Sequence, residues 1–520
     1  TTEDAGDSYD MRFAAWNINR LAKDNTAWFT DYATAFLQSQ IALGFNAEQA
    51  AGFARGFADN NINGTPLPLT PSGNPRFQPG SAAFQNALET VKQDADFTTG
   101  AKFKDNSRIY HSDANYNFRD IIKFAEIQVG GSFRRYSLNS DGTIFTDYDG
   151  PIEYDEYGAY MQVQKKFLED RLKFTGSIRY DKSKLFEGQY SPRVSFVYSA
   201  GEKKNHNFQT GFRNPTTQDL FIGLNLGPFA LIGSAAENLD RYVETLPVSQ
   251  NAQNTLGQPS TVTLSGGNAY TNAYTVQSVQ AFAASQNPAD LRVANISLVK
   301  PEQVKAFEVG YKSALDNGLS VDINAYYNLY NDFLSTSRVI TPYYGIAGEN
   351  SADPQVQLSY AALANGDRRV YQVYSNSATD ISSFGFGLGV SKKIYKDFEF
   401  GLNYNHAQFE FDQAKDPSFI AGFNTPRHRA KANIGNDKLF KNFGFNVNAR
   451  WSDEYLWQSS FADGVIPSMT VFDAQVSYKI PAIKSVLKLT ASNIGGGDYL
   501  QVVGAGRIGQ TYLASLTINP

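Results

Sequence analysis

The stretch DRLKFTGSIRYDKSKLFEGQYSPRVSFVYS, residues 170–199, alternates apolar and polar side chains over two successive runs. Leu172, Phe174, Ile178 and Tyr180 stand at alternate positions, and mostly polar or charged residues stand between them. Because successive side chains of a strand point to opposite faces, the stretch predicts two neighbouring strands with one apolar and one polar face. Whether the apolar face contacts a protein core or lipid decides the class of protein.

The composition excludes several classes of protein. The chain has 520 residues, a net charge of −5 and 14% aromatic residues, and it contains no Cys. The charge argues against a broad nucleic-acid surface, and the lack of Cys excludes disulfides and thiolate metal sites. No apolar run is long enough for a membrane-spanning helix. The opening TTEDAGDSYD does not resemble a signal peptide, so we expect a mature or truncated product, or a cytosolic protein.

Two-faced runs recur along the chain, and we count roughly 16 candidate strands from alternation and turn signals. Such runs of about ten residues have the length that spans a bilayer when the strand is tilted. The clearest cover residues 121–135, 156–166, 171–181, 304–313, 319–333, 398–411, 443–451, 470–479, 486–493 and 509–518.

The connections between these runs alternate between short and long. Tight turns are expected near residues 168, 313, 395, 436 and 481, and long connections at 214–301, 335–369, 412–427, 452–467 and 495–504. Outer-membrane barrels have short periplasmic turns and long outer loops, and closure removes exposed sheet edges. The alternation therefore favours an all-β, transmembrane antiparallel β-barrel over a soluble protein with several sheets. It places residues 214–301 outside the cell and the turn at 313–318 in the periplasm.

Residues 1–104 do not alternate like the rest, and we expect one barrel strand there followed by a long helical outer loop, with the barrel covering 105–520. Asn46 is a candidate N-cap for a helix over residues 47–57, and a second helix is expected within 26–43. Aromatic residues follow one stripe of each helix, Trp28 and Tyr32 among them. We interpret these rings as packing the loop on itself, with ligand contact as the alternative.

Four segments resemble the barrel of TonB-dependent outer-membrane receptors. They are NHNFQTGFRNPTTQDLF (205–221), LVKPEQVKAFEVGYKSALDNGLSVDINAYYNLYNDFL (298–334), FNTPRHRAKANIG (423–435) and TASNIGGGDYLQVVGAGRIGQTYLASLTI (490–518). Each is weak alone, but their fixed order is specific. The resemblance covers residues 105–520, and 1–104 more loosely.

The resemblance implies a 22-strand barrel around an N-terminal plug, with substrate bound on the outer side and energy supplied by the TonB complex through a short N-terminal box. The plug, the TonB box and the first strands would lie before Thr1, and the closing INP lacks the family's usual terminal aromatic residue. It implies the outer membrane of a Gram-negative bacterium, no enzymatic activity and no cofactor. The implied partners are outer-membrane lipid and lipopolysaccharide, the TonB complex, and a surface lipoprotein or another outer-membrane protein, with no nucleic acid.

The function implied by the resemblance is uptake of a nutrient too large for porins, either a glycan, a peptide or a metal chelate. The alternative is a barrel that does not transport and serves as a scaffold within a larger outer-membrane assembly. A passive porin is disfavoured because the long loops exceed what an open pore needs.

Two sets of residues are candidates for a binding site. Charged residues on the polar strand faces are predicted to point into the barrel, where they either pair with the plug and with each other or line a ligand path: Lys173, Arg179, Glu308, Lys312 and Arg450. Aromatic residues of the two longest loops are candidate ligand contacts, with packing inside the loop as the alternative: Phe221, Phe229, Tyr343 and Tyr344.

No catalytic or metal site is predicted. The four His residues lack metal-ligand spacing, and each is interpreted as a lumen or surface residue. Asp59, Asn61, Asn63 and Gly64 begin like a calcium-binding loop, but Thr70 stands where the bidentate Glu belongs. An ordinary turn is the favoured interpretation of that motif.

Overall fold

The computed structural model describes residues 7–62, 64–199, 203–315, 317–416, 419–459 and 463–518. Asn63 of the calcium-like motif lies outside them. The chain divides into two compact units, which are described separately. The first, which we call the helical unit, comprises Thr1–Arg108, Ser137–Ile152 and Ile222–Leu231. The second, the strand unit, comprises Ile109–Tyr136, Glu153–Phe221 and Ile232–Pro520.

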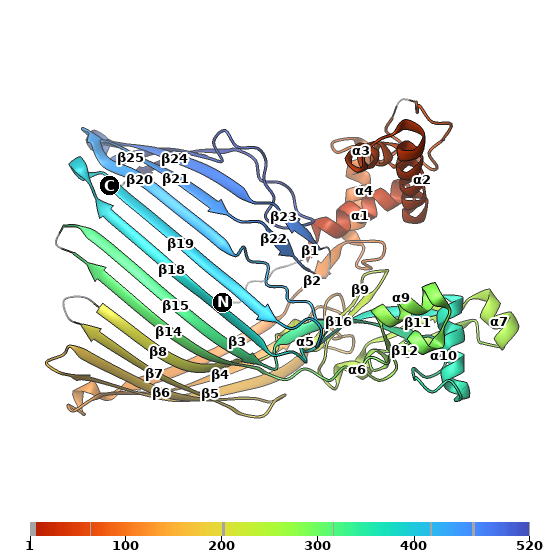
Figure 1. Cartoon of the computed structure of the whole chain (residues 1–520), viewed down its shortest axis with the longest axis horizontal. Coiled ribbons are helices and arrows are strands. Elements are labelled where there is room, and N and C mark those ends of the chain that lie inside the picture. Colours follow the sequence, from red (N-terminus) through yellow and green to blue (C-terminus); the bar gives the residue numbers. More distant parts are fainter. Residues whose placement is uncertain are drawn as a thin grey trace. The chain divides into compact units, whose positions relative to one another are not determined.

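One large sheet of 15 strands dominates the strand unit (Figure 1), close to the roughly 16 strands expected from the sequence. Its order is β26-β25-β24-β21-β20-β19-β18-β15-β14-β8-β7-β6-β5-β4-β3. The strands are β3 (Arg108–Asn117), β4 (Glu126–Leu138), β5 (Ile152–Phe167), β6 (Leu172–Ser183), β7 (Gln189–Ser199), β8 (Lys203–Arg213), β14 (Glu302–Ala314), β15 (Leu319–Asn331), β18 (Ile381–Lys393), β19 (Glu399–Phe411), β20 (His428–Phe440), β21 (Phe443–Ser452), β24 (Met469–Ile480), β25 (Ser485–Ser492) and β26 (Thr511–Ile518).

Pairing between neighbouring strands is antiparallel and follows the predicted alternation. Ile178 of β6 lies opposite Met161 of β5, whereas Arg179 lies opposite Tyr160, so apolar and polar residues keep to separate faces. The side chain of Ile178 is 51% exposed although it is apolar and near the middle of its strand. Most boundaries of these runs lie within two residues of expectation, but those of two strands do not. β5 begins at Ile152, four residues before the expected start. The run at 121–135 begins as a strand only at Glu126, because a 3-10 turn at Phe118–Asp120 precedes it.

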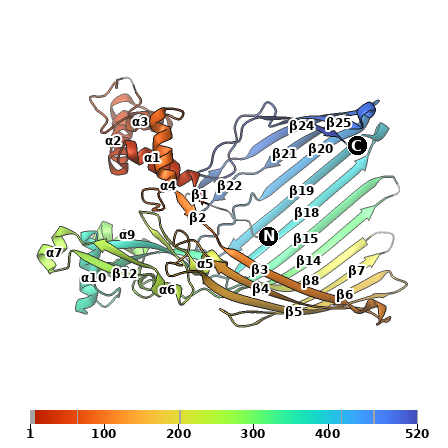
Figure 2. The ribbon, with the colours of Figure 1, turned by 180° about the vertical axis from the view of Figure 1, so that it is seen from behind.

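The tight turns gather at one end of the sheet and the long connections at the other, as Figures 1 and 2 show. The long connections cover residues 214–301, 332–380, 412–427, 453–468 and 493–510. The alternation has one exception. Residues 184–188, between β6 and β7, belong to the end with the long connections yet are as short as a turn.

The two longest connections fold together into a compact layer that we call the loop core. Strands β13 (Tyr274–Thr275), β16 (Leu334–Pro342) and β17 (Arg368–Asn376) pair in it. Helices α9 (Val276–Ser285) and α10 (Pro354–Asn365) pack on this sheet through Val279, Phe282 and Tyr360, which are buried with Tyr274. We expected short helices in one long loop, and the structure shows that the loop core contains helices as well.

Smaller elements complete the connections. They are α5 (Thr217–Phe221), β9 (Gly223–Asn225), β10 (Ala230–Ile232), α6 (Asn238–Arg241), β11 (Val243–Pro247), α7 (Gln250–Leu256), β12 (Thr261–Ser265), α8 (Asn268–Thr271), β22 (Tyr455–Trp457) and β23 (Gly464–Ile466), with 3-10 turns at Pro288–Asp290, Tyr395–Asp397 and Pro481–Ile483.

The helical unit contains α1 (Met11–Ala22), α2 (Asn25–Leu43), α3 (Ala47–Ala58) and α4 (Ala82–Gln93), with a two-stranded sheet of β1 (Asp7–Tyr9) and β2 (Lys102–Lys104). The two predicted helices correspond to α2 and α3, while α1 and α4 were not expected. Asn46 caps α3 in a capping box with Gln49, which confirms the predicted N-terminus. Among the described residues, the helices are all too short or too polar to cross a membrane.

Aromatic rings of α2 and α3 pack together, as the sequence interpretation held. Phe57 is buried, and Tyr32, Phe36 and Phe53 contact its cluster. A second cluster joins α1 to α4 through Ile18 and Val91. The helical unit therefore has its own apolar core.

Candidate functional site

A pocket of about 620 Å³ opens on the polar face of β4, β5 and β6, beside the end of β8. Its position follows from the topology, because β4 runs into the connection at 139–151 and β8 into the connection at 214–301. The pocket therefore lies at the end of the sheet that carries the long connections. Its principal polar side chains are His111, Ser132, Arg134, Tyr136, Glu156, Arg179, Asp181 and Asn214.

Glu156 is the centre of one hydrogen-bonded group in this pocket. Asn214 Nδ2 donates to its carboxylate at 3.0 Å, Tyr136 Oη donates at 3.4 Å, and Arg134 Nη1 lies at 3.5 Å. Arg134 also donates to Tyr136 Oη at 3.1 Å. Two donors from β4 and one from the connection after β8 thus hold one carboxylate in a fixed position.

Arg179 and Asp181 form a second charged pair on the same face. Arg179 Nε donates to Asp181 Oδ2 at 2.7 Å and Nη2 to Oδ1 at 2.6 Å, which is bidentate geometry. Nη2 also donates to Ser132 Oγ at 3.1 Å. With Arg134, Lys182 and Glu156, the pocket holds three cations and two anions, and each has an opposite partner, since Lys182 Nζ lies 3.7 Å from Glu187. It therefore presents donors and acceptors without a strong field of either sign.

Stacked aromatic rings form the adjoining wall. Tyr136 and Tyr154 lie with centroids 4.7 Å apart and planes at 15°. Phe221 of α5 lies behind Tyr154, at 5.8 Å, and is fully buried. Phe221 was predicted to contact ligand from a loop. The structure buries it against Tyr154, so the packing alternative describes its surroundings, and ligand contact stays a prediction.

The structure does not bring the five charged candidates together. Arg179 lies in the pocket, and Arg450 on β21 donates from Nε to Asp473 Oδ2 at 3.0 Å. Lys312 lies 3.2 Å from Asp322, directly across the β14/β15 pair.

The other two charged candidates lie elsewhere on the sheet. Glu308 is exposed on β14, and Lys173 is half-buried opposite Lys166 on β5. Where the structure shows an ion pair for a candidate, the partner is an Asp of the same or a neighbouring strand. That all five point into a lumen stays a prediction.

The three remaining loop candidates are divided between the two units. Tyr344 is buried in the loop core, where its hydroxyl donates to Asp367 Oδ2 at 2.9 Å, and Tyr343 is half-buried against the same cluster. Burial raises the pKa of Tyr344 to about 12, so its hydroxyl stays protonated. Phe229 is half-buried in the helical unit. For Tyr344 the packing alternative describes what the structure shows.

Sequence reasoning missed Arg134, Tyr136 and Glu156. They lie on two strands whose register a single sequence does not fix, and only the run FRRY at 133–136, with two charges between two rings, marked the first two. It also missed a His pair, because register places His406 opposite His428 with their Nδ1 atoms 3.4 Å apart. The side chain of His206 lies outside the described residues.

The described part of the chain offers no group of three or more His, Cys, Asp or Glu side chains placed to hold a metal ion. The His406–His428 pair supplies two ligands, fewer than the three protein ligands of a catalytic zinc site or the four of a structural one. Asp59, from the calcium-like motif, is instead bonded to Trp28 and Arg76.

A large antiparallel sheet with an apolar outward face, tight turns at one end and long connections at the other is the architecture of an outer-membrane β-barrel. The chain belongs to the TonB-dependent receptor-like β-barrel family, whose model matches residues 2–494. Barrels of this family are outer-membrane proteins of Gram-negative bacteria, and they serve as receptors and transporters. No curated protein matches the sequence.

Solved structures of similar fold include two iron-related receptors. The ferric enterobactin receptor PfeA from Pseudomonas aeruginosa is 12% identical with a TM-score of 0.51, and the match covers 79% of this chain and 54% of that one. The FrpB iron transporter from Neisseria meningitidis, in its apoprotein form, is 11% identical with a TM-score of 0.51, covering 80% and 57%. This chain thus spans little more than half the length of either, and the likeness shows the fold alone.

Proposed function

We propose that this chain is the barrel of an outer-membrane receptor that imports a nutrient too large for porins, with energy from the TonB complex. The observation that carries the proposal is the polar, aromatic-walled pocket at the end of the sheet where the long connections gather. A ligand arriving from outside the cell meets this end first. Membership in the TonB-dependent receptor family supports the proposal that the TonB complex supplies the energy.

The pocket suits a ligand with several polar groups. Arg134 can bind an anionic group of a ligand in place of Glu156, and Glu156 can bind a cationic group in place of Arg134. The Tyr136 ring offers a flat apolar contact. Glycans, peptides and metal chelates all present such combinations. The names of the similar structures, a ferric enterobactin receptor and an iron transporter, support including a ferric chelate in the test.

The test is uptake by cells that carry point variants of the pocket. A strain lacking the gene is grown on single glycans, peptides and ferric chelates to find the dependent nutrient. The double variant Arg134→Gln/Glu156→Gln is expected to slow uptake of that nutrient at limiting concentration, and loss of the TonB complex is expected to abolish it. Lys393→Gln/Glu399→Gln, which removes an exposed ion pair at the tight turn between β18 and β19, is the matched control.

Point variants are preferable to excision of residues 223–240. That segment contains Ile232 and Asn238, which are both fully buried, so its removal disturbs neighbouring parts of the fold. If uptake of every nutrient is unchanged without the gene, transport is refuted and a scaffold role takes its place. If uptake depends on the gene and on TonB but ignores the pocket variant, the receptor function stands and the pocket assignment is wrong.

A further inference from the structure

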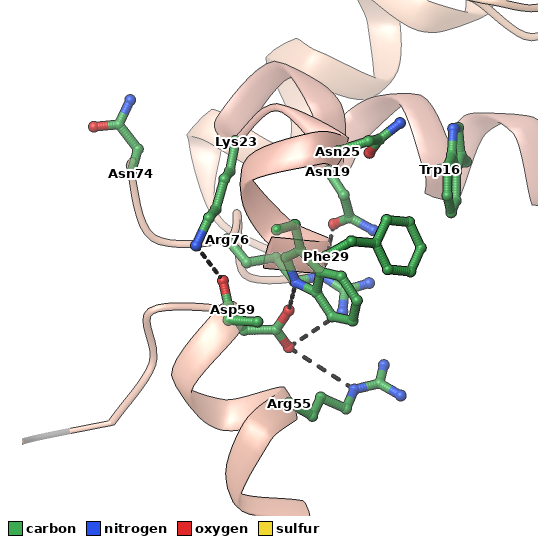
Figure 3. Close-up of a pocket in the computed structure, with 11 residues that line it drawn as sticks. Trp16, Asn19, Lys23, Asn25, Phe29, Arg55, Asp59, Asn74 and Arg76 are labelled. Atoms are coloured by element: carbon green, nitrogen blue, oxygen red, sulfur yellow. Dashed lines mark hydrogen bonds and ion pairs between the residues drawn. The ribbon is translucent and has the colours of Figure 1, made fainter. Parts of the chain in front are cut away.

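The helical unit contains a pocket of its own, with a volume of about 190 Å³ (Figure 3). It is formed by α1, α2, the end of α3 and the segment that contains Asn74 and Arg76. The family match and the similar structures assign no role to these residues. The pocket lies wholly within one compact unit, so its geometry can be considered alone.

The base of this pocket is held rigid by Asp59. Trp28 Nε1 donates to Asp59 Oδ1 at 2.8 Å, while Arg76 Nη1 lies 3.4 Å and Arg55 Nε 3.8 Å from Oδ2. Arg76 Nε also donates to Asn19 Oδ1 at 2.6 Å. Side chains from three helices and one loop are thus fixed before any ligand arrives, which lowers the entropy cost of binding.

The rim of the pocket is aromatic and open to solvent. Trp16 is 42% exposed and Phe29 52% exposed, with ring centroids 6.0 Å apart. Phe29 rests edge-on against Trp28, at 5.1 Å and 89°. Other rings of the same helix, such as Tyr32, pack against α3 instead. The apolar core of the helical unit does not require two large exposed rings beside a group of fixed polar side chains.

The charges in this pocket leave one guanidinium in excess. Lys23 Nζ donates to Asp31 and to the carbonyl of Ala58, and the single carboxylate of Asp59 faces both Arg55 and Arg76. This excess disfavours a cationic ligand and is compatible with a neutral or an acidic one. Asn25 and Arg55 line the same pocket as Phe29 (Figure 3), so it offers an amide and a guanidinium beside its exposed ring.

The size and the chemistry of the pocket narrow the ligand class. The volume is below the roughly 300–1,000 Å³ of sites for drug-sized ligands, so a single ring is the appropriate scale. Amides both donate and accept hydrogen bonds, as hydroxyl groups do, and the face of an aromatic ring is apolar. A ligand with a flat, apolar ring face and hydroxyl groups around its edge fits the volume, the hydrogen-bonding groups and the aromatic rings of this pocket.

We propose that the helical unit binds carbohydrate, with one sugar ring resting on Trp16 and Phe29 and its hydroxyl groups bonded to Asn25 and Arg55. The proposal is independent of transport, since a receptor for any nutrient, or a scaffold, can carry such a site.

The experiment measures sugar binding to the full chain purified in detergent. The probes are maltoheptaose, cellohexaose, laminarihexaose and an oligogalacturonate, and binding is followed by tryptophan fluorescence and by calorimetry. At least one probe is expected to bind. Trp16→Ala and Phe29→Ala are each expected to weaken it roughly tenfold, the scale of losing about 1.4 kcal/mol of contact. Leu37→Ala, on α2 outside the pocket and 56% exposed against the 52% of Phe29, is expected to leave affinity within twofold.

Each outcome is decisive. Circular dichroism checks that the variants keep their helices. We expect the helices to be kept, because the substituted side chains are exposed and not part of the apolar core. Binding of the oligogalacturonate alone, with loss in Arg55→Gln, supports the proposal and identifies an acidic sugar. Binding that survives both Trp16→Ala and Phe29→Ala overturns it, as does failure of all four probes to bind.

Discussion

The loop core and the large sheet use the same apolar residue types in opposite ways. Tyr371 and Val373 of β17 are fully buried, whereas Ile178, Ile323 and Phe472 lie exposed on the sheet. In water, exposure on that scale is unfavourable, since burying such a side chain contributes roughly 1.5–3 kcal/mol. The difference indicates that the two regions face different solvents: the loop core excludes water, and the outward face of the sheet contacts lipid.

Ion pairs differ between the two regions as well. Arg369 and Glu244 meet at 3.0 Å inside the loop core, with side chains only 8% and 10% exposed. Lys312 and Asp322, across β14 and β15, remain 71% and 55% exposed. Burial disfavours the charge of Arg369, but the hydrogen bond and the charge attraction to Glu244, with smaller contributions from Tyr242 and Tyr371, together outweigh burial and raise the pKa of Arg369, so its guanidinium stays charged. The loop core therefore contains an ion pair with both partners buried, whereas both partners of the Lys312–Asp322 pair are exposed.

The largest expected effect comes from breaking the buried pair. Glu244→Gln leaves Arg369 charged and uncompensated, and is expected to destabilise the loop core by about 3–5 kcal/mol. Hydrogen exchange at amides of β17 and α10 measures the loss, while the heat-modifiable gel mobility of the sheet should be retained. Asp322→Asn, in the exposed pair, should cost about 0–1 kcal/mol. Similar effects from the two substitutions would contradict the contrast.

The next effect tests the lipid face. Ile178→Arg is expected to destabilise the sheet by about 2–4 kcal/mol if the position is near the bilayer midplane. Thr175→Arg, on the polar face of the same strand, should be tolerated far better. Heat-modifiable mobility of the two variants, compared in denaturant series, gives the difference. Equal damage would argue that both faces of β6 are packed against protein.

A third test uses pH on a buried pair in the helical unit. Burial opposes ionisation of Asp31, but hydrogen bonds from Lys23 and Ser72 outweigh it and lower the pKa of its carboxyl from the usual 3.8. Stability from this group is therefore complete above pH 3.8 and is lost as the pH falls through the lower, folded value. Helical circular dichroism should show this loss. Asp31→Asn removes the dependence and costs about 1.5–3 kcal/mol at neutral pH.

The sheet was predictable from sequence because alternation at every second residue is a local signal. The capping box of Asn46 and Gln49 was equally local. The loop core was not predicted, because β16 and β17 pair across 25 intervening residues, numbers 343–367. Both faces of these strands are largely buried, so their sequences do not alternate between apolar and polar residues. The group around Glu156 was missed for the same reason, because strand register brings its members together.

The smallest expected effect separates packing from ligand contact. Tyr344 was a candidate for binding, yet its hydroxyl donates to Asp367, which also accepts from Ser249 Oγ at 2.8 Å. Tyr344→Phe removes two hydrogen bonds, the one to Asp367 and one that the hydroxyl accepts from Asn365 Nδ2 at 3.1 Å, and should destabilise the loop core by about 1–2 kcal/mol, measurable by hydrogen exchange in β17. Uptake of the dependent nutrient should be unchanged, because the ring and its packing remain. Slower uptake with an unaltered loop core would return Tyr344 to the binding surface, and would mean that the loop core opens toward ligand.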